Sequence, residues 1–471
     1  MTKPSAPALL PLALFLALFV GSGLWFQTEG VEYAFYQVSA PVAILPAIAL
    51  AVLLAKGPLH QRIDTFVRGV GDHTIVTMAL IYLLAGGFAS VAKAVGGVDA
   101  TVNFGLSVIP PALVLPGLFA IAAFVATAMG TSMGTVAAIA PIAVGVADAT
   151  DLPLLLTVGT VVGGAMFGDN LSIISDTTIA ATRTQNVEMR DKFRMNLRIA
   201  LPAALLTMAW LALQGSTAAV EAPGDYDLLR VMPYVAVLVM AVLGVNVLLV
   251  LFTGILLAGG IGLALEADYS LVSLSKDIYT GYTNMQEILI LSLLIGGLGA
   301  LMKAGGGLAW LSSVIDRLSR ARGGQGVRGD AGKVREKNNG KNRDKCSEAG
   351  GVRSGELSIA LAVTATNVCV ANNTVAILLN GDLARDIAAR YRVDPRRAAS
   401  LLDIFSCAVQ GLLPWGAQIL LASSLAAVSP LALVASIEYC WLLGLAGLIS
   451  IFIRSPRSLA SAPELTGSDP S

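Results

Sequence analysis

Long runs of residues without Asp, Glu, Lys or Arg recur along the whole 471-residue chain. A helix needs about 20 apolar residues to cross about 30 Å of hydrocarbon, and most of these runs approach or exceed that length. Hydrophobic residues make up 55% of the sequence and charged residues only 13%, unlike a soluble domain. The sequence therefore predicts an all-α polytopic membrane protein. The uncharged runs are 8–26, 38–55, 74–92, 100–147, 153–168, 199–220, 231–265, 288–302, 357–381, 404–437 and 439–453.

Two of these runs contain a break near their middle. The run 231–265 would extend roughly 50 Å as one helix at about 1.5 Å per residue, so we expect it to divide near Gly244–Asn246. The run 100–147 contains the Gly-rich segment MGTSMGT at 129–135. Such a segment predicts two helix halves joined by a turn at membrane depth, which could be two crossings or one re-entrant hairpin.

An internal repeat divides the chain into two halves. The segment LLAGGFASVAKAVGG (83–97) matches LLIGGLGALMKAGGG (293–307) at eight of fifteen positions, and TVA at 135–137 matches TVA at 374–376. The two offsets differ by about the length of segment 317–355, which holds eleven Lys/Arg and four Asp/Glu and is predicted to be a disordered basic loop. The prediction is a repeat at 1–220, a second repeat at 231–455 that contains this loop, and a flexible tail at 456–471.

The distribution of basic residues decides how the break at 129–135 is interpreted. If about 100–147 and about 357–388 each form a re-entrant hairpin, each repeat has five crossings and the repeats are inverted. All but three of the 31 basic residues then fall on one side, including those of the predicted loops 56–73 and 183–198. Cytoplasmic loops carry such an excess of Lys and Arg. We therefore predict re-entrant hairpins in a protein of the cell inner membrane, with both termini cytoplasmic.

The hairpin tips are candidate binding elements. Non-helical backbone at membrane depth survives only where it is buried in protein or lines a polar cavity. Hydroxyl, amide and helix-end backbone groups at such tips are ligands for a small cation or an anion. The alternative reading is that small tip residues only pack helices together. The candidates are Thr131, Ser132 and Thr135 at the first tip, and Asn372, Asn373 and Thr374 at the second.

Each hairpin is followed by a span that is interrupted by polar or helix-breaking residues. The first, 153–182, is broken around FGDNLS, and the second, 400–428, around LLPWGAQ. Asp169, Ser172 and Asp176 stand at i, i+3 and i+7, a spacing that would place them on one helix face. Ionisable groups within a membrane usually face a cavity or relay. The alternatives are that Asp169 and Asp176 are caps near the cytoplasmic end and that Asp403 stabilises a helix start.

Four motifs, in this order, resemble the NhaC-type sodium/proton antiporter family of the ion transporter superfamily: GTSMGT, GDNLSIISDTT, ATNVCVANNTVAI and LLPWGAQ. The resemblance implies secondary active transport by two inverted repeats, with a mobile transport domain moving against a dimeric scaffold. Some relatives exchange organic acids or carry amino acids. The family's ion-binding groups correspond here to Asp169, Asn170, Ser175, Asp176 and Thr177.

The leading functional hypothesis is a Na⁺/H⁺ antiporter that exchanges inward protons for outward sodium. Burial favours the protonated form of a carboxylic acid, and a second acid with surrounding oxygens can hold Na⁺ instead, so Asp169 and Asp176 are the candidate Na⁺ site. Asp403, Trp415 and Gln418 of the second broken span are further candidates. The alternatives are a Na⁺-coupled transporter of an amino acid or small organic acid, and an intramembrane aspartyl protease using Asp169 and Asp403.

The expected partners are the lipid bilayer, the transported Na⁺ and H⁺, and a second copy of the chain in a homodimer. The sequence predicts no cofactor, no nucleic-acid partner and no enzymatic activity.

Overall fold

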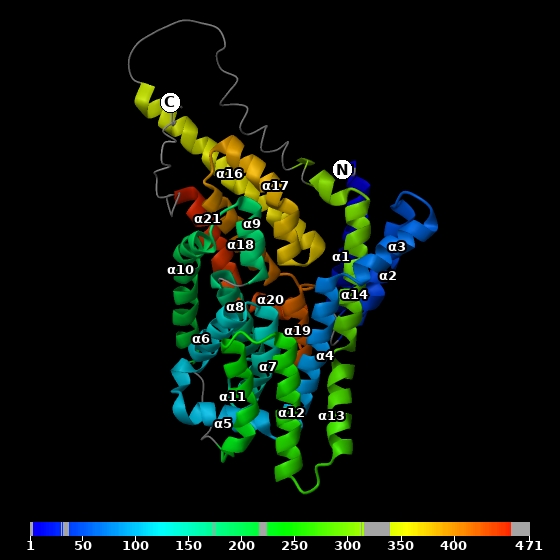
Figure 1. The fold of residues 1–471 in the computed structure, drawn as a ribbon, viewed down its shortest axis with the longest axis vertical. Helices are drawn as coiled ribbons and strands as arrows, with labels where there is room; N and C mark the ends of the chain where they lie inside the picture. The colour runs from blue at the N-terminus through cyan, green and yellow to red at the C-terminus, as the bar shows by residue number, and fades with distance from the viewer. Residues whose placement is uncertain are drawn as a thin grey trace, which may run out of the picture.

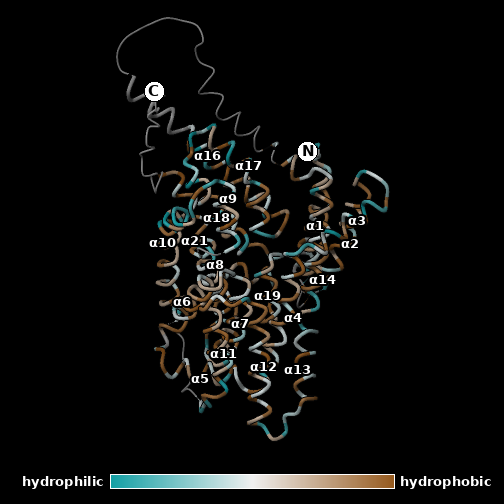
Figure 2. The backbone as a smooth tube through the Cα atoms, in the orientation of Figure 1, coloured by the Kyte–Doolittle hydropathy of each residue, from teal (hydrophilic) through white to brown (hydrophobic). Residues whose placement is uncertain are grey.

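The computed structural model describes residues 3–29, 31, 37–172, 175–215, 224–311, 313–314 and 340–453, and these residues fold into a bundle of helices (Figure 1). Seven helices in this part of the chain are long and apolar enough to cross a bilayer. Figure 2 shows hydrophobic residues along the lengths of the helices and hydrophilic residues at several of their ends. The fold is that of an all-α, multi-span membrane protein, as predicted.

The first half of the chain contains a short 3₁₀ helix, η1, followed by α1 to α10. Their bounds are η1 Ala6–Leu9, α1 Leu10–Thr28, α2 Ala40–Leu54, α3 Leu59–Val70, α4 His73–Ala94, α5 Gly97–Val108, α6 Pro111–Met129, α7 Ser132–Asp148, α8 Leu154–Leu171, α9 Asp176–Gln185 and α10 Met189–Gly215.

The second half contains α11 to α14 and α16 to α21. Their bounds are α11 Leu228–Val242, α12 Val247–Leu265, α13 Leu271–Asn284, α14 Gln286–Ala304, α16 Gly340–Val370, α17 Asn373–Tyr391, α18 Pro395–Gln410, α19 Ala417–Ala426, α20 Pro430–Ala435 and α21 Glu438–Ile453.

One group of helices, here called the frame, comprises α1 to α4 and α11 to α14. Within it α4 packs on α13, and α3 packs on α14. Both contacts are made at glycines: a side chain at Gly86 would collide with the backbone of Gly281, and one at Gly69 would collide with that of Gly296. Small residues at such crossings let helix backbones approach closely, so the frame is held together by backbone-to-backbone contact.

The other group, here called the site bundle, comprises α6 to α10 and α16 to α21. The helix pair α6–α7 packs on α8, and α16–α17 packs on α18. Helices also cross between the halves of the chain, because α7 packs on α19 and α9 packs on α17. This arrangement brings the helix breaks of both halves into one region.

Three predicted segments differ from the structure. Residues 59–70 of the predicted loop 56–73 form the helix α3, because Leu59, Ile63 and Val67 recur at helical spacing. The predicted hairpin range 100–147 includes most of α5, which ends at Val108, while α6 begins at Pro111. The residue before a proline is disfavoured in a helix, so Pro110 and Pro111 favour a break here.

Of the predicted disordered loop 317–355, residues 317–339 lie outside the described residues, whereas 340–355 belong to α16. No proline interrupts the chain between 340 and the apolar run, so the helix extends upstream of that run. The predicted tail 456–471 also lies outside the described residues.

Candidate functional site

Two helix breaks lie at the predicted hairpin tips. Helix α6 ends at Met129, Gly130 adopts the left-handed conformation with φ of 69°, and the Thr131 hydroxyl caps α7 by accepting from the Gly134 N–H at 3.4 Å. At the second tip, the Asn372 side chain caps α17 by accepting from the Val375 N–H at 2.9 Å. Both tips are thus short turns with polar caps inside an apolar environment.

Two further breaks interrupt the spans that follow the tips. Helix α8 ends at Leu171, and Ser175 caps the start of α9. Helix α18 ends at Gln410, and α19 begins at Ala417. Backbone groups at such helix ends lack partners within their own helix, and discontinuous helices of this kind form the ion sites of many transporters.

Asp169, near the end of α8, is buried with an exposed fraction of 4%. The Ser132 hydroxyl donates to its Oδ2 at 2.9 Å, and the Thr177 hydroxyl donates to its Oδ1 at 3.4 Å. Both donors are neutral hydroxyl groups, one from the first tip and one from α9. The carboxyl group is therefore surrounded by oxygen atoms, which are the ligands that a small hard cation prefers.

A line of hydrogen bonds connects Asp169 to the second half of the chain. The Ser132 hydroxyl accepts from Gln418 Nε2 at 3.0 Å, and Gln418 Oε1 accepts from Gln410 Nε2 at 3.0 Å. Gln410 Nε2 also donates to the carbonyl of Ala371 at 3.1 Å. Both tips and both broken spans therefore belong to one polar network.

A second carboxylate, Asp403, forms a fully buried ion pair with Lys192. The distance from Lys192 Nζ to Asp403 Oδ2 is 2.8 Å, and both side chains have an exposed fraction of 0%. The same ammonium donates to the carbonyl of Asn170 at 2.9 Å and to the Thr178 hydroxyl at 2.6 Å. Asn196 Nδ2 adds a second donor to Asp403 Oδ2 at 2.6 Å.

Lys192 was not among the residues expected from the sequence, because it was counted with the basic cluster 183–198. A signal for its burial is present, however. Lys192 and Asn196 are followed by Ile199, Ala200 and Ala203 at helical spacing on α10, and all five residues are buried. A basic residue in line with an apolar stripe predicts a buried charge rather than a surface one.

Several buried acceptors of this network lack a donor. Within the described residues, Asp403 Oδ1, Asn170 Oδ1 and Gln410 Oε1 have no hydrogen-bond partner. Buried polar groups are normally paired, and all three of these atoms are oxygens. Groups of three or more His, Cys, Asp and Glu side chains that could hold a metal ion are absent from the described part of the chain.

The structure separates Asp176 from Asp169. Asp176 is exposed in the first turn of α9, where a carboxylate stabilises a helix start. The predicted shared helix face is wrong, because α8 ends at Leu171, Ser172 is extended, and α9 begins at Asp176. Ser172 points elsewhere as well, since its hydroxyl donates to the carbonyl of Thr127 at 3.0 Å.

The other predicted residues divide into two groups. The contacts around Asp169, Asp403 and Lys192 are here called the acid network. Ser175 and Asn170 belong to it, because the Ser175 hydroxyl donates to the Asp169 carbonyl at 3.3 Å and the Asn170 carbonyl accepts from Lys192. Four residues have partners outside the acid network: Thr135 donates to the Thr131 carbonyl, Asn373 to Cys407 Sγ, Trp415 to the Val368 carbonyl, and the Thr374 N–H to the Asn373 side chain.

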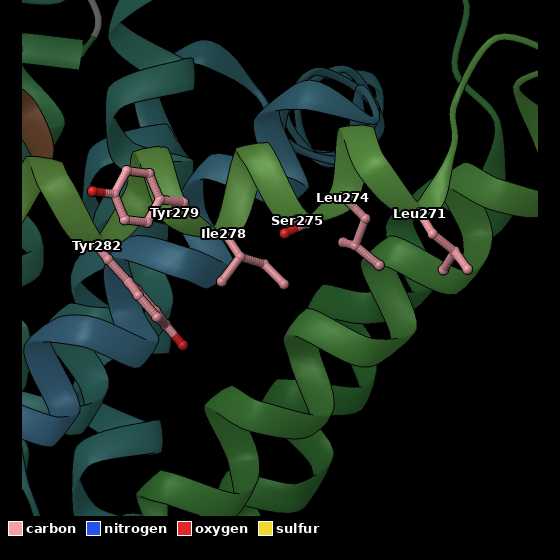
Figure 3. A pocket seen from close by; sticks show the side chains of 6 residues that line it. All are labelled: Leu271, Leu274, Ser275, Ile278, Tyr279 and Tyr282. Carbon is pink, nitrogen blue, oxygen red and sulfur yellow. The ribbon is translucent and has the colours of Figure 1, made fainter.

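A cavity of about 340 Å³ lies along α13 (Figure 3). It is lined by Leu271, Leu274, Ser275, Ile278, Tyr279 and Tyr282. All six residues belong to the frame, and none belongs to a helix that carries Asp169, Asp403 or Lys192. This cavity is therefore separate from the acid network.

Comparisons with known proteins find similarity to membrane antiporters. Residues 5–215 match the Na⁺/H⁺ antiporter family. The chain is 31% identical over 216 residues to the Na⁺/H⁺ antiporter NhaC of Bacillus subtilis, covering 42% of this chain and 46% of that protein. It is 29% identical over 206 residues to the malate-2H⁺/Na⁺-lactate antiporter of the same organism, covering 43% of this chain and 42% of that protein. The chain thus spans less than half the length of these two relatives.

A longer alignment exists with the arginine/ornithine antiporter ArcD of Halobacterium salinarum, at 24% identity over 399 residues, 80% of this chain and 79% of that protein. Among solved structures, the YdaH transporter of Alcanivorax borkumensis is similar with a TM-score of 0.43 and 12% identity, covering 95% of this chain and 98% of that chain.

Broken helices that enclose buried carboxylates within a multi-span bundle define a membrane transporter. The resemblance to the NhaC-type family is confirmed, because residues 5–215 match the Na⁺/H⁺ antiporter family. This is a family of transporters, so the prediction that the chain is not an enzyme is confirmed, and the protease alternative is excluded.

Proposed function

We propose that the protein is a Na⁺/H⁺ antiporter in which Asp169 binds either a proton or Na⁺. The observation that carries this proposal is the buried Asp169 carboxyl, whose donors among the described residues are two hydroxyls and no cation. A buried carboxylate without a counter-ion is costly, and either a proton or a sodium ion removes that cost. Competition between the two ions for one carboxyl is sufficient for exchange.

The ion pair beside Asp169 supports this division of roles. Lys192 already neutralises Asp403 at 2.8 Å. Of the two buried acids, Asp169 is therefore the one whose charge a transported ion would neutralise. The unpaired oxygens of Asp403, Asn170 and Gln410 offer further ligands on that side of the network. Asp176, which is exposed, has no place in this exchange step.

In this proposal, the two halves of the chain are inverted repeats, and their relative motion opens the site to each side in turn. The matching segments 83–97 and 293–307 lie largely on α4 and α14, and their glycines make corresponding contacts, Gly86 with α13 and Gly296 with α3. Each half also contributes one hairpin and one broken span. Alternating access would arise when the site bundle moves against the frame, with protons moving inward and sodium outward across the inner membrane, and with both termini in the cytoplasm.

A second candidate is exchange of an amino acid or organic acid coupled to Na⁺ or H⁺. The observation that favours it is that the longest of the alignments reported above, over 80% of this chain, is to a protein named as an arginine/ornithine antiporter. The exchanged ligand would bind at the same tips, and Asp169 would then be a coupling site or a contact for a cationic ligand.

Proteoliposomes with an imposed ΔpH and an internal pH dye separate the two candidates. Addition of Na⁺ or Li⁺ alone should dissipate ΔpH, whereas K⁺ or choline at equal ionic strength serves as the control. If Na⁺ has no effect and labelled arginine, lactate or malate is exchanged instead, the second candidate replaces the first.

A further inference from the structure

A second cavity, of about 380 Å³, lies at the ends of η1, α2 and α14 beside the start of α3. Its polar lining consists of Lys3, Ser5, Lys56, Gln61, Arg62 and Thr65. Three of these side chains are cationic and none is acidic. The volume falls within the range of ligand sites, about 300 to 1,000 Å³. The cavity belongs to the frame and shares no residue with the acid network.

The cations of this cavity have no acidic partner within the described part of the chain. Arg62 is held in place by the end of α2: its Nε donates to the Gly57 carbonyl at 2.7 Å and its Nη1 to the Val52 carbonyl at 2.9 Å. A guanidinium has five N–H donors, so three remain for a ligand. The Lys3 and Lys56 side chains form no ion pair among the described residues, and the nearby Asp64 is engaged with Arg68 at 2.9 Å.

Apolar side chains stand exposed next to these cations in the sequence. Leu53 has an exposed fraction of 74%, Leu59 of 59% and Ile63 of 49%. Leu53 precedes Lys56 at the end of α2, and Leu59 and Ile63 flank Arg62 on α3. A basic cavity on helices that also carry exposed apolar residues matches a molecule with an anionic head and apolar chains.

We propose that this basic cavity binds the phosphate head group of an anionic phospholipid, whose acyl chains lie against the exposed leucines of α2 and α3. Basic pockets between membrane helices bind such head groups, and each Lys or Arg near an anionic surface adds to the attraction. Because the cavity joins α2, α3 and α14, a bound lipid stabilises this corner of the frame.

Binding is tested on purified full-length protein in neutral detergent, by native mass spectrometry and by thermal unfolding. Short-chain phosphatidylglycerol should bind saturably and raise the Tm, whereas phosphatidylcholine and inorganic phosphate at equal concentration should not. In Lys3→Gln/Lys56→Gln, affinity for phosphatidylglycerol should fall on the order of tenfold. Lys93→Gln/Lys276→Gln is the matched control, since both lysines are exposed and lie outside the cavity, and it should bind as the wild type does.

Three outcomes would overturn the proposal. Equal binding of phosphatidylcholine would show that charge plays no part, and equal stabilisation by inorganic phosphate would assign the cavity to a soluble anion. Unchanged affinity in Lys3→Gln/Lys56→Gln would place the lipid elsewhere. The readout is binding rather than transport, so each result is independent of the proposed antiport.

Discussion

Asp169 and Asp403 are both buried at broken spans, yet their partners differ. Asp403 is paired with the Lys192 ammonium at 2.8 Å, whereas the donors to Asp169 within the described part of the chain are the hydroxyls of Ser132 and Thr177. A buried charge that is paired within the protein is fixed in place, and removing one member of such a pair is strongly destabilising. A buried carboxyl without a cation gains most from an ion that arrives from outside. In the proposed antiport, Asp403 therefore has a structural role and Asp169 binds the exchanged ion.

The largest effect is expected for Asp169→Asn. The amide keeps the size and much of the hydrogen bonding of the carboxyl but cannot alternate between a proton and Na⁺. Sodium-dependent dissipation of ΔpH should fall at least about 100-fold, a loss of about 2.7 kcal/mol in transition-state free energy. Glu438→Gln, at the start of α21, is the control and should retain activity. Normal exchange in Asp169→Asn would mean that the exchanging acid lies elsewhere, and Asp403 would be tested next.

Lys192→Met tests the structural role of the Lys192–Asp403 ion pair. It leaves the Asp403 carboxylate buried without its counter-ion, which should destabilise the protein by about 3 to 5 kcal/mol. Lys192→Met/Asp403→Asn removes both charges and should recover most of that loss in thermal unfolding of the purified protein. Because Asp169 remains, the double variant should also still exchange Na⁺ for H⁺. An inactive double variant that folds normally would show that the ion pair takes part in exchange.

A smaller effect is expected at the first tip. Ser132→Ala removes the 2.9 Å hydrogen bond to Asp169 and the acceptor of Gln418, so the KM for Na⁺ should rise about tenfold, equivalent to about 1.4 kcal/mol. Thr135→Val is the matched control, because the Thr135 hydroxyl donates to the Thr131 carbonyl within its own helix. If the two variants show the same KM, the Ser132 contact does not contribute to ion binding.

The smallest effect is expected for Asp176→Asn. This side chain is exposed at the start of α9, where a carboxylate contributes about 0.3 to 1 kcal/mol to helix stability. The Tm should fall slightly, and the rate of exchange should stay within about threefold of normal. A loss as complete as that of Asp169→Asn would show that Asp176 carries an ion during the cycle, as the sequence first suggested.

Most helix breaks were predictable because their signals are local. Gly, Pro, Thr and Asn often end or cap helices. The structure has helix ends at Gly130 and Thr131, at Gly244 to Asn246, and around Pro414 and Gly416. The acid Asp169 was also predictable, because an acid inside an apolar span is costly unless it faces a polar site.

The Lys192–Asp403 pair was not predictable in the same way. The two residues are far apart in the sequence, and their contact depends on how α10 packs against α18. Lys192 also lies among basic residues that the positive-inside rule assigns to a cytoplasmic loop. The sequence therefore predicts an exposed loop lysine at this position and not a buried one. The position of Asp176 was predicted wrongly because helical spacing does not hold across the break between α8 and α9.

The glycine contacts of the frame limit how the sequence can change over time. Gly86 and Gly281 touch backbone to backbone, as do Gly69 and Gly296. Usually a larger side chain on one helix can be compensated by a smaller one on its neighbour. Here the neighbour has no side chain left to shorten, so a substitution at any of these four positions has no compensating change across the contact. A larger side chain at one of these glycines could be accommodated only if the two helices moved apart.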